Sequence, residues 1–349
     1  MFAPTIAVVI LNYNGKHFLA QFLPSVLQYS AEAKVIVADN GSTDDSLAFL
    51  SLYPTVQVIA LKKNYGFAGG YNEALRQVQA DYYILLNSDV EVTPGWIPPV
   101  VQLMEENEIA ICQPIIKSFH HNSHFEYAGA AGGFIDRWGF TFCRGRLFDT
   151  LEEDKGQYDD NMPVFWASGA CLFIKSSVFW ELGGFDAYFF AHMEEVDLCW
   201  RAHHQGFLVY CCGASEVFHV GGGTLKKENP QKTFLNFRNN LIMLQKNTPK
   251  MKLLSTIFVR LLLDGMSGVR FLLKGQVSNF GAVLKAHFHF YKYLFLIKKK
   301  KRYNLKHLRN YSKSIVWAYF IEHRRTFKEL DFPNGRSLTQ MFTHTHNKS

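Results

Sequence analysis

The amino-acid sequence predicts an α/β fold with a mostly parallel sheet flanked by helices, followed by a C-terminal helical appendage. Between Thr5 and about Gln113, short apolar runs alternate with amphipathic stretches, a pattern typical of a parallel sheet with helices on its faces. Three of the apolar runs end in polar turns, as strands do at a ligand-binding edge. A hydrophobic content of 48% with 19% charged residues excludes a disordered chain.

The expected elements follow one another in a regular order. The apolar runs predict strands over residues 6–11, 34–38, 56–60, 82–86 and 109–113. The stretches between them predict helices over residues 17–28, 44–52, 69–78 and 96–107, the second of which begins after good N-cap residues. Residues 120–163 are irregular and contain several glycines, so we expect a functional or mobile loop there. A second αβ section is expected over residues 164–220.

Polar side chains follow three of the expected strands at the point where each strand ends. The first strand leads into Asn12 and Asn14, the second into Asp39, and the fourth into a turn that carries Asp89. In open α/β sheets the carboxyl ends of the strands are where ligands bind. These turns therefore predict a crevice suited to a nucleotide and its diphosphate.

Five segments of the chain resemble family 2 glycosyltransferases, and most closely the rhamnosyltransferase-like members that build bacterial surface polysaccharides. The likeness covers roughly residues 5–245, and its specificity comes from the order and spacing of the segments. It implies a GT-A fold and inverting transfer from a nucleoside-diphosphate sugar to a hydroxyl of a glycan or lipid-linked glycan. The segments are residues 9–14, 39–44, 64–72, 183–186 and 194–199.

The resemblance assigns donor-binding residues to the strand ends and to the loop before the third helix. It implies that Asp39 accepts a hydrogen bond from the base or the ribose, although an Asp here also suits a turn or a helix cap. Asn12 and Asn14 would line the same pocket. The loop over residues 64–72 precedes a helix, so its amide groups could face the donor; it is not a G-x-G-x-x-G motif, which argues against a dinucleotide fold. The expected donor-binding residues are Asn12, Asn14, Asp39, Asn64, Gly66, Asn72 and Asp89.

A divalent ion, Mg²⁺ or Mn²⁺, is expected to bind at Asp89 and bridge the oxygens of the diphosphate. Asn87 stands where the family often has a first Asp, which leaves one carboxylate in place of two. His219 resembles the family's histidine after the last core strand, and could ligate the metal or hydrogen-bond the diphosphate. Arg238 could also pair with the diphosphate or with an anionic acceptor. Alternatives are a turn-forming Asp89 and a structural His219.

The general base is expected at the start of a helix near residue 194. Carboxylates that cluster raise one another's pKa, which suits a base near neutral pH. The family's base is the Asp that follows a Glu, and that position is Glu195 here, with Glu194 as the alternative. A solvated acidic helix face would explain the same residues. By resemblance, the acceptor side comprises Trp166, Asp186, Glu194 and Asp197.

Charge and composition bear on partners and location. The formal net charge of +7 favours anionic partners; with the motifs above we expect a nucleoside-diphosphate sugar, a glycan or lipid-linked glycan acceptor, and no nucleic acid. No basic and apolar leader precedes the first strand, and the six cysteines form no C-x-x-C pair. We therefore expect reduced, buried thiols in a cytoplasmic protein that is peripheral at the inner face of the cell membrane.

The chain changes character beyond about residue 226. Residues 235–245 and 252–273 predict helices with interleaved basic residues, and residues 282–297 are strongly aromatic before the basic run Lys298–Arg302. No run of about 18 apolar residues supports a membrane-spanning helix. We expect contact with an anionic membrane surface, the alternative being a helical cap on the catalytic domain. The expected divisions are residues 1–230 (catalytic), 231–331 (helical) and 332–349 (disordered).

Two other functions are compatible with parts of this pattern. A sugar nucleotidyltransferase shares the general fold, but it needs a Gly-rich loop with Arg or Lys after the first strand, where this chain has Asn12-Tyr13-Asn14-Gly15. A catalytically silent member that binds glycans or serves as a scaffold is the other alternative, because of the departures at Asn87 and Glu195. Donor hydrolysis with and without divalent metal would separate these functions.

Overall fold

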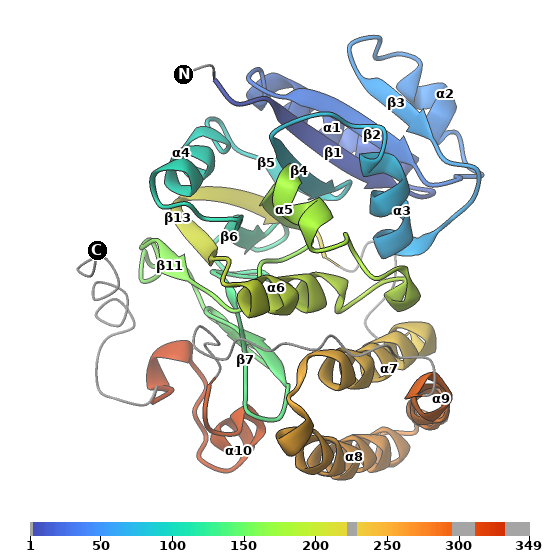
Figure 1. Ribbon diagram of the computed structural model, residues 1–349, viewed down its shortest axis with the longest axis vertical. Coiled ribbons are helices and arrows are strands. Elements are labelled where there is room, and N and C mark those ends of the chain that lie inside the picture. The colour runs from blue at the N-terminus through green and yellow to red at the C-terminus, as the bar shows by residue number, and fades with distance from the viewer. Residues whose placement is uncertain (1–2, 222–228, 295–310, 332–349) are drawn as a thin grey trace.

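The computed structural model describes residues 3–221, 229–294 and 311–331, and Figure 1 shows a large twisted sheet above a group of C-terminal helices. Within the described residues the main sheet has nine strands in the order β11-β13-β6-β12-β4-β1-β2-β3, with β5 paired to β13. The strands are β1 (Ile6–Asn12), β2 (Lys34–Asp39), β3 (Gln57–Ala60), β4 (Tyr82–Asn87), β5 (Val90–Val92), β6 (Ile111–Ser118), β11 (Met162–Pro163), β12 (Cys171–Lys175) and β13 (Val209–His219).

Helices cover both faces of this sheet. They are α1 (Lys16–Tyr29), α2 (Ser46–Leu50), α3 (Gly66–Leu75), α4 (Pro98–Glu106), α5 (Ser176–Glu181) and α6 (Glu194–Gln205), with a short 3₁₀ turn η1 (Ala187–Phe189) before α6. The α/β fold with a large, mostly parallel sheet is confirmed, and the predicted elements of the first half differ from the observed ones by a few residues at their ends.

The pairing of the strands brings distant residues to one edge of the sheet. Strands β4, β1, β2 and β3 are parallel, so their carboxyl ends lie together. Strand β12 is antiparallel to both β4 and β6, and β13 is parallel to β6, so β13 runs in the same direction as β4. The last residue of β13, His219, is therefore at the same edge as Asn12, Asp39 and Asn87.

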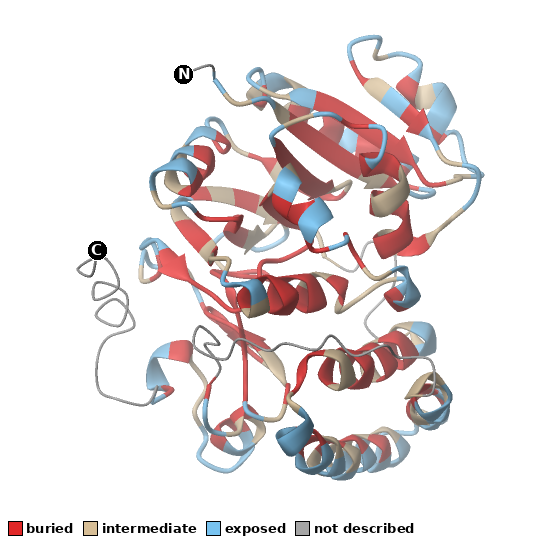
Figure 2. Cartoon of the chain, viewed as in Figure 1, coloured by how far each residue is buried: buried red, intermediate tan, exposed pale blue. Residues whose placement is uncertain are grey.

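The core consists of two apolar layers separated by the sheet, which Figure 2 shows as buried strands between partly exposed helices. Strand β4 alternates between them: Tyr83 and Leu85 face one layer, and Ile84 and Leu86 face the other. This is the period of two that a strand buried on both faces requires. The apolar run that predicted β4 thus fixes Asn87 and Asp89 at the edge of a rigid element.

Residues 120–163 contain more regular structure than we predicted. They include a four-stranded antiparallel sheet made of β7 (Gly133–Ile135), β8 (Thr141–Cys143), β9 (Arg146–Leu147) and β10 (Thr150–Leu151). The described C-terminal segment, with α10 (Ile315–Phe320) and η2 (Phe327–Glu329), packs against this small sheet. Tyr311 donates its N–H to the Ile135 carbonyl at 2.8 Å, and the rings of Phe134 and Phe327 lie 4.9 Å apart.

The C-terminal region forms three long helices, α7 (Pro230–Asn247), α8 (Lys250–Leu273) and α9 (Val277–Leu294), in the lower part of Figure 1. Among the described residues, none of these helices is long and apolar enough to cross a membrane. Leu241 and Phe290 belong to the same apolar cluster as residues of the main sheet, so helices α7 and α9 contribute to that core. The division near residue 230 stays a prediction. The predicted disordered tail, residues 332–349, lies outside the described residues, and so do residues 295–297 at the end of the aromatic segment. All six cysteines are buried and free, as expected.

Candidate functional site

The ends of β1 and β2 are joined by a buried polar contact. The Asn12 side-chain amide donates to Asp39 at 3.1 Å, and Asp39 also accepts the Ser42 N–H at 3.0 Å. Both side chains are buried, and among the described residues the Oδ1 atom of Asn12 has no hydrogen-bond partner. A buried acceptor without a donor is costly unless a ligand or water satisfies it. The structure thus brings these two predicted donor-binding residues together at one strand edge.

The remaining predicted donor-side residues shape the loops around this edge. Asn14 has a left-handed φ of 50° and accepts the Thr43 N–H at 2.7 Å, so it joins the loops after β1 and β2. Asn64 accepts the Gly66 N–H at 2.7 Å. Gly66 has a φ of 73°, and an added Cβ would lie 2.5 Å from Phe190, so only glycine fits there. Asn72 makes two hydrogen bonds with the backbone of Phe185 and ties α3 to the segment before η1.

Asp89, His219 and Glu126 form a buried charged cluster at the same edge. Strand β5 pairs with β13 so that Val90 lies opposite His219, which puts Asp89 beside the imidazole. The Nε2 atom of His219 lies 3.2 Å from Asp89 Oδ1, and its Nδ1 atom lies 3.4 Å from Glu126 Oε2. The Asn87 amide is 3.5 Å from the same Nε2 atom.

The two carboxylates decide the charge of this histidine. Burial alone would lower the pKa of His219, but Asp89 and Glu126 outweigh burial and raise the pKa to about 10. Without a metal ion the imidazole is therefore protonated at neutral pH. Burial pushes the pKa of Glu126 upward, but His219 and Arg146 bring it below its ordinary value. Sequence reasoning missed Glu126, because a single Glu in an irregular Gly-containing segment carries no recognisable signal.

The donor set of this cluster fits a divalent ion that is bound mainly through a substrate. Asp89 Oδ1 and His219 Nε2 are separated by 3.2 Å, close to the spacing of neighbouring ligands around an ion whose bonds are about 2.1 Å long. Glu126 lies at the other ring nitrogen and cannot share the same ion. Within the described ranges no three His, Cys, Asp or Glu side chains form a metal-binding group. An ion here would take its other ligands from diphosphate oxygens and water.

Glu194 and Glu195 begin helix α6 with little hydrogen bonding of their carboxylates. One buried oxygen of each, Oε2, has no hydrogen-bond partner within the part of the chain that the structure describes. Burial is the main cause that raises the pKa of Glu195 to about 7 and that of Glu194 well above its ordinary range, and Glu195 raises the latter further. An added Cβ on Gly169 would lie 3.9 Å from the Glu195 Cβ, so Glu195 lies beside the segment that leads into β12.

The predicted acceptor-side residues are held in different ways. Asp197 is fully buried, its carboxylate is bound by Arg201 at 2.8 Å and Lys246 at 3.0 Å, and these cations help keep its pKa low despite burial. Asp186 caps η1 and pairs with the same Lys246 at 2.7 Å. Trp166 is buried under β7 and donates to the Phe134 carbonyl at 2.9 Å. Among the three, Asp186 is the side chain with a carboxylate near the surface.

The loop that precedes α6 is strained and is held by helix α7. Phe190, His192 and Met193 have φ values of 65°, 71° and 74°, a conformation that residues other than glycine rarely adopt. The Asn239 amide lies 2.9, 2.8 and 2.7 Å from the carbonyls of Phe189, Ala191 and His192.

Arg238 supports the segment just before this loop. Its Nη2 atom donates to the carbonyls of Tyr188 and Phe189 at 3.0 and 2.9 Å, so part of the guanidinium holds η1. Its contact with the diphosphate or an anionic acceptor stays a prediction. From the sequence, Arg238 was expected to pair with the diphosphate or with an anionic acceptor, and no role was predicted for Asn239. The sequence does not reveal that the fold places both side chains against η1 and the loop after it.

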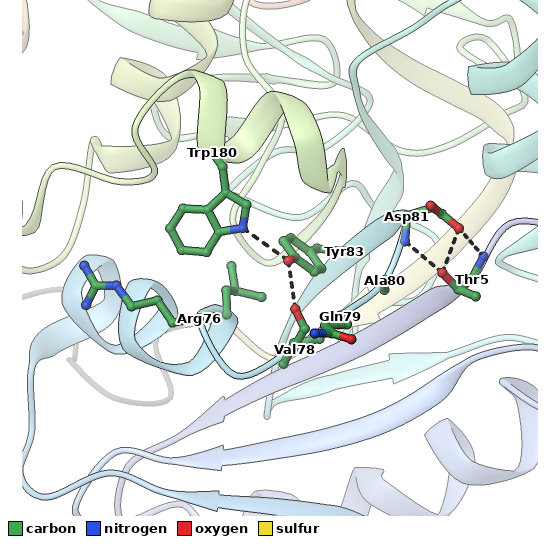
Figure 3. Close-up of a pocket in the computed structure, with 9 residues that line it drawn as sticks. Thr5, Arg76, Val78, Gln79, Ala80, Asp81, Tyr83 and Trp180 are labelled. Atoms are coloured by element: carbon green, nitrogen blue, oxygen red, sulfur yellow. Dashed lines mark hydrogen bonds between the residues drawn. The ribbon is translucent and has the colours of Figure 1, made fainter.

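A surface hollow at the opposite end of the sheet is unrelated to these residues (Figure 3). It is lined by Thr5 and Asp81, which precede β1 and β4, and by Tyr83 and Trp180. Thr5 and Asp81 hydrogen-bond each other, and Trp180 donates to the Tyr83 hydroxyl at 3.3 Å. These side chains satisfy one another, and the hollow lies at the amino-terminal end of the strands, so we assign it no role in binding the donor.

A comparison with protein families identifies the family to which the chain belongs. A family model described as glycosyl transferase family 2 matches residues 7–183, about half of the chain. The chain therefore belongs to glycosyl transferase family 2, and the resemblance seen in its sequence segments is confirmed.

Two curated relatives are similar over most of their length. An N-acetylglucosaminyl-diphospho-decaprenol L-rhamnosyltransferase of Mycobacterium tuberculosis is 28% identical over 230 residues, which cover 61% of this chain and 75% of the relative. A low-salt glycan biosynthesis hexosyltransferase of Haloferax volcanii is 22% identical over 242 residues, which cover 68% of this chain and 74% of the relative. The expected likeness to rhamnosyltransferases is thus supported by a relative of that name.

Solved glycosyltransferase structures share the fold. GalNAc-T7 with UDP, GalNAc and Mn²⁺ matches with a TM-score of 0.54 and 17% identity, over 70% of this chain and 48% of that chain. A mannosyltransferase from Pyrobaculum calidifontis, in complex with GDP-Man and Mn²⁺, matches with a TM-score of 0.52 and 11% identity, over 83% of this chain and 88% of that chain. This chain spans about half the length of the first and most of the second. The predicted GT-A-like fold is confirmed.

Replacing Asn239 by Ala is expected to lower kcat for glycosyl transfer by about ten- to a hundredfold, because small displacements of reacting groups are costly. Without the amide, the left-handed residues before Glu194 and Glu195 lose the donor that holds their carbonyls. The KM for the donor should stay near the wild-type value. Steady-state kinetics with the donor and acceptor varied separately would measure both constants.

The matched control is Asn240→Ala, since Asn240 is also buried on α7 but donates to Gly139 at 3.0 Å, away from this loop. Equal losses of kcat in the two variants, or a wild-type kcat in Asn239→Ala, would contradict this role for Asn239.

Proposed function

We propose that this chain is an inverting glycosyltransferase that moves a sugar from a nucleoside-diphosphate sugar to a hydroxyl of a glycan or lipid-linked glycan. The observation that carries the proposal is the arrangement around the end of β4. The Asn87 N–H donates to the Ala170 carbonyl at 2.9 Å, which joins β4 to the segment beside Glu195. Asp89 follows the end of β4, and His219, the last residue of β13, lies 3.2 Å from it. The Asp89–His219 pair, which suits a diphosphate, and the Glu195 carboxylate, whose pKa is raised, thus adjoin the same edge of the main sheet.

The donor is proposed to bind along the edge made by β1, β2 and β4. Asp39 and the unpartnered oxygen of Asn12 would contact the base or ribose, since both lie at adjoining strand ends. The loops that contain Asn14, Asn64 and Gly66 would line the nucleotide-binding pocket. Asn72 would support these loops, because its hydrogen bonds to Phe185 hold α3 in place. The name of the sugar does not follow from these residues, because sugar choice depends on the shape of the occupied pocket.

The diphosphate is proposed to lie against Asp89 and His219. Where a Mg²⁺ or Mn²⁺ ion is bound, Asp89 and His219 would hold it, and the ion would neutralise charge that develops on the leaving diphosphate. Glu126 keeps the imidazole in place from its other nitrogen. The protonated imidazole has only two N–H groups, and they face Asp89 and Glu126, so a hydrogen bond from His219 to a phosphate oxygen would require Nε2 to release Asp89. We therefore propose metal ligation as the role of His219, with the hydrogen bond to the diphosphate as the alternative.

Glu195 is proposed as the general base. Its carboxylate would accept the proton of the acceptor hydroxyl while the acceptor oxygen bonds to the anomeric carbon and the bond from that carbon to the diphosphate oxygen breaks. One displacement of this kind inverts the anomeric configuration. Asp186 and Lys246, which are paired near the surface, are proposed to border the acceptor. Asp197 and Trp166 would act by supporting the framework, because both are buried in it.

The acceptor is proposed to be a lipid-linked glycan, and the enzyme to act as a peripheral protein at the inner face of the cell membrane. The relative from Mycobacterium tuberculosis carries a decaprenol-linked substrate in its name, which supports this class of acceptor. The basic run Lys298–Arg302, which suggested an anionic membrane from the sequence, lies outside the described residues.

Replacing Asp89 by Ala is expected to lower donor turnover by at least about a hundredfold, because the group that would anchor the ion and the diphosphate is lost. The fold should survive, since His219 keeps Glu126 as a charged neighbour. Donor hydrolysis and transfer would be measured with and without added Mn²⁺, and the melting temperature would be recorded in parallel. The control is Glu91→Ala, a partly buried carboxylate two residues along the chain. A near wild-type rate in Asp89→Ala would show that the diphosphate binds elsewhere.

Replacing Glu195 by Gln is expected to preserve donor binding and to slow transfer by about a hundredfold or more, since the amide keeps the shape but cannot take a proton. Donor affinity would be measured by calorimetry and transfer by product formation. Glu194→Gln is the matched control from the adjacent position. If Glu194→Gln were slow and Glu195→Gln active, the two glutamates would exchange roles.

The same assignment predicts the pH dependence of the wild-type enzyme. The pKa of Glu195 is raised to about 7, so the base is protonated and inactive below that pH and active above it. The kcat/KM for transfer, which reports the ionisation of the free enzyme, should therefore fall as pH drops through about 7. A kcat/KM that stays constant down to pH 5 would contradict the raised pKa of the base.

A further inference from the structure

Helix α8 buries two charged residues, Arg260 and Asp264, in its middle. Its buried residues include Thr256, Arg260 and Asp264, and the Arg260 guanidinium lies 3.1 Å from Asp264. His287 of α9 approaches the same carboxylate at 3.4 Å, and Arg260 lies over the ring of Phe140 at 3.7 Å. A surface helix in water normally shows the opposite arrangement, with its polar residues outward.

The outward side of α8 is a continuous apolar stripe. Seven of its side chains are between 53% and 97% exposed, and at 100° per residue they fall within an arc of roughly 120°. The helix has 24 residues, so the stripe is about 36 Å long. In Figure 2 the exposed side of α8 forms the lower edge of the molecule. The members of the stripe are Met251, Leu254, Phe258, Leu262, Met266, Val269 and Leu273.

The charges around the stripe have one sign. Across residues 250–294, all described, the single acidic side chain is the buried Asp264. The exposed charged residues on α8 and just after it are Lys250, Lys252, Arg270 and Lys274. By the same helical spacing Lys252, Arg270 and Lys274 border one side of the stripe and Lys250 the other. A protein partner would require matching acidic groups around an apolar groove, whereas anionic lipid headgroups above acyl chains supply both in one surface.

Helix α9 adds a second, shorter set of exposed apolar side chains. Leu284, Phe288 and Tyr291 are exposed at the i, i+4 and i+7 spacing of one helix face. Lys285 and Lys292 are exposed on the same helix. The pair of helices therefore repeats one pattern, in which aliphatic and aromatic side chains are exposed beside basic ones.

We propose that the exposed stripe of α8 inserts into the interface of an anionic lipid bilayer, with α8 lying parallel to the membrane plane. The basic residues along its borders would then meet the headgroups. The apolar stripe, more than the net charge, would supply the binding. This inference deepens the proposed function by naming the surface on which a lipid-linked acceptor would be met, and its significance for catalysis rests on that function.

Co-sedimentation with vesicles tests this inference. The full chain would be mixed with phosphatidylcholine vesicles that contain 0 or 30% phosphatidylglycerol, roughly the contrast needed for charge to act. The test variant replaces Phe258, Leu262 and Met266 by Ser. We expect wild type to bind the anionic vesicles and the variant to bind at least about tenfold more weakly. The matched control replaces Leu47, Leu52 and Val58 by Ser, which are exposed apolar residues far from α8 in the sequence, and should bind as wild type.

A charge variant, light scattering and donor hydrolysis separate membrane binding by the stripe from the alternatives. A second variant, Lys252→Gln with Arg270→Gln and Lys274→Gln, should lose the preference for anionic vesicles. Wild-type protein that ignores the vesicles, or a serine variant that binds as wild type, would overturn the proposal. A wild-type dimer in light scattering that the serine changes convert to a monomer, without vesicle binding, would assign the stripe to a second copy of this chain instead. Donor hydrolysis would be measured for each protein, because its retention in the serine variant separates failure of membrane docking from failure of the proposed enzyme.

Discussion

A buried histidine between two carboxylates organises the candidate site. His219 ends the last strand of the sheet, Asp89 follows β4, and Glu126 comes from the segment after β6, so three distant parts of the chain meet at one imidazole. A buried charge is stable only when it is paired, and here each carboxylate is paired with the same imidazole. The strand edge that would bind a donor is thus held by charges as well as by the ladder of the sheet.

The two sets of acidic residues at this edge are in opposite electrostatic states. Glu126 faces a cation, and its pKa is held below its ordinary value. The Oε2 atoms of Glu194 and Glu195 have no hydrogen-bond partner among the described residues, and burial raises the pKa values of both carboxyl groups. Environments that push the pKa values of neighbouring acids apart are how one site provides both a charge stabiliser and a proton acceptor. The fold keeps the two sets apart through the Gly169–Ala170 segment, which adjoins the end of β4.

The sequence predicted the parts of the site that depend on strand periodicity. Apolar runs located β1, β2 and β4, and the polar residues directly after them reached the same edge because parallel strands end together. His219 was found through its resemblance to the family's histidine after the last core strand, and it does end β13. The role of Glu126 and the clamp by Asn239 were not predictable, because each depends on tertiary contacts between segments without a regular pattern. The small sheet of β7–β10 was also missed, since strands of two or three residues are too short to show alternation.

The contacts of Arg238 and of helix α8 also depend on tertiary packing that the sequence pattern does not reveal. The interleaving of apolar and basic residues in α8 suggested a membrane surface, but only the packing shows that its charged residues Arg260 and Asp264 are inside and its apolar stripe outside. Arg238 was expected at the diphosphate because Arg pairs well with phosphate, and part of its guanidinium binds the carbonyls of η1. The chemistry of a side chain defines which kinds of partner it can bind, and the fold determines which of these partners lies within contact distance.

The central claim, that the β1–β2–β4 edge binds a nucleoside-diphosphate sugar, is tested most directly by thermal denaturation in the presence of candidate donors. A ligand that binds only the folded state at one hundred times its Kd stabilises it by about 2.7 kcal/mol, which is readily detected as a rise in melting temperature. The account predicts that at least one of the UDP-, GDP- or dTDP-sugars raises the melting temperature, and that Mn²⁺ or Mg²⁺ increases the effect. No stabilisation by any of them, with or without divalent metal, would contradict the account.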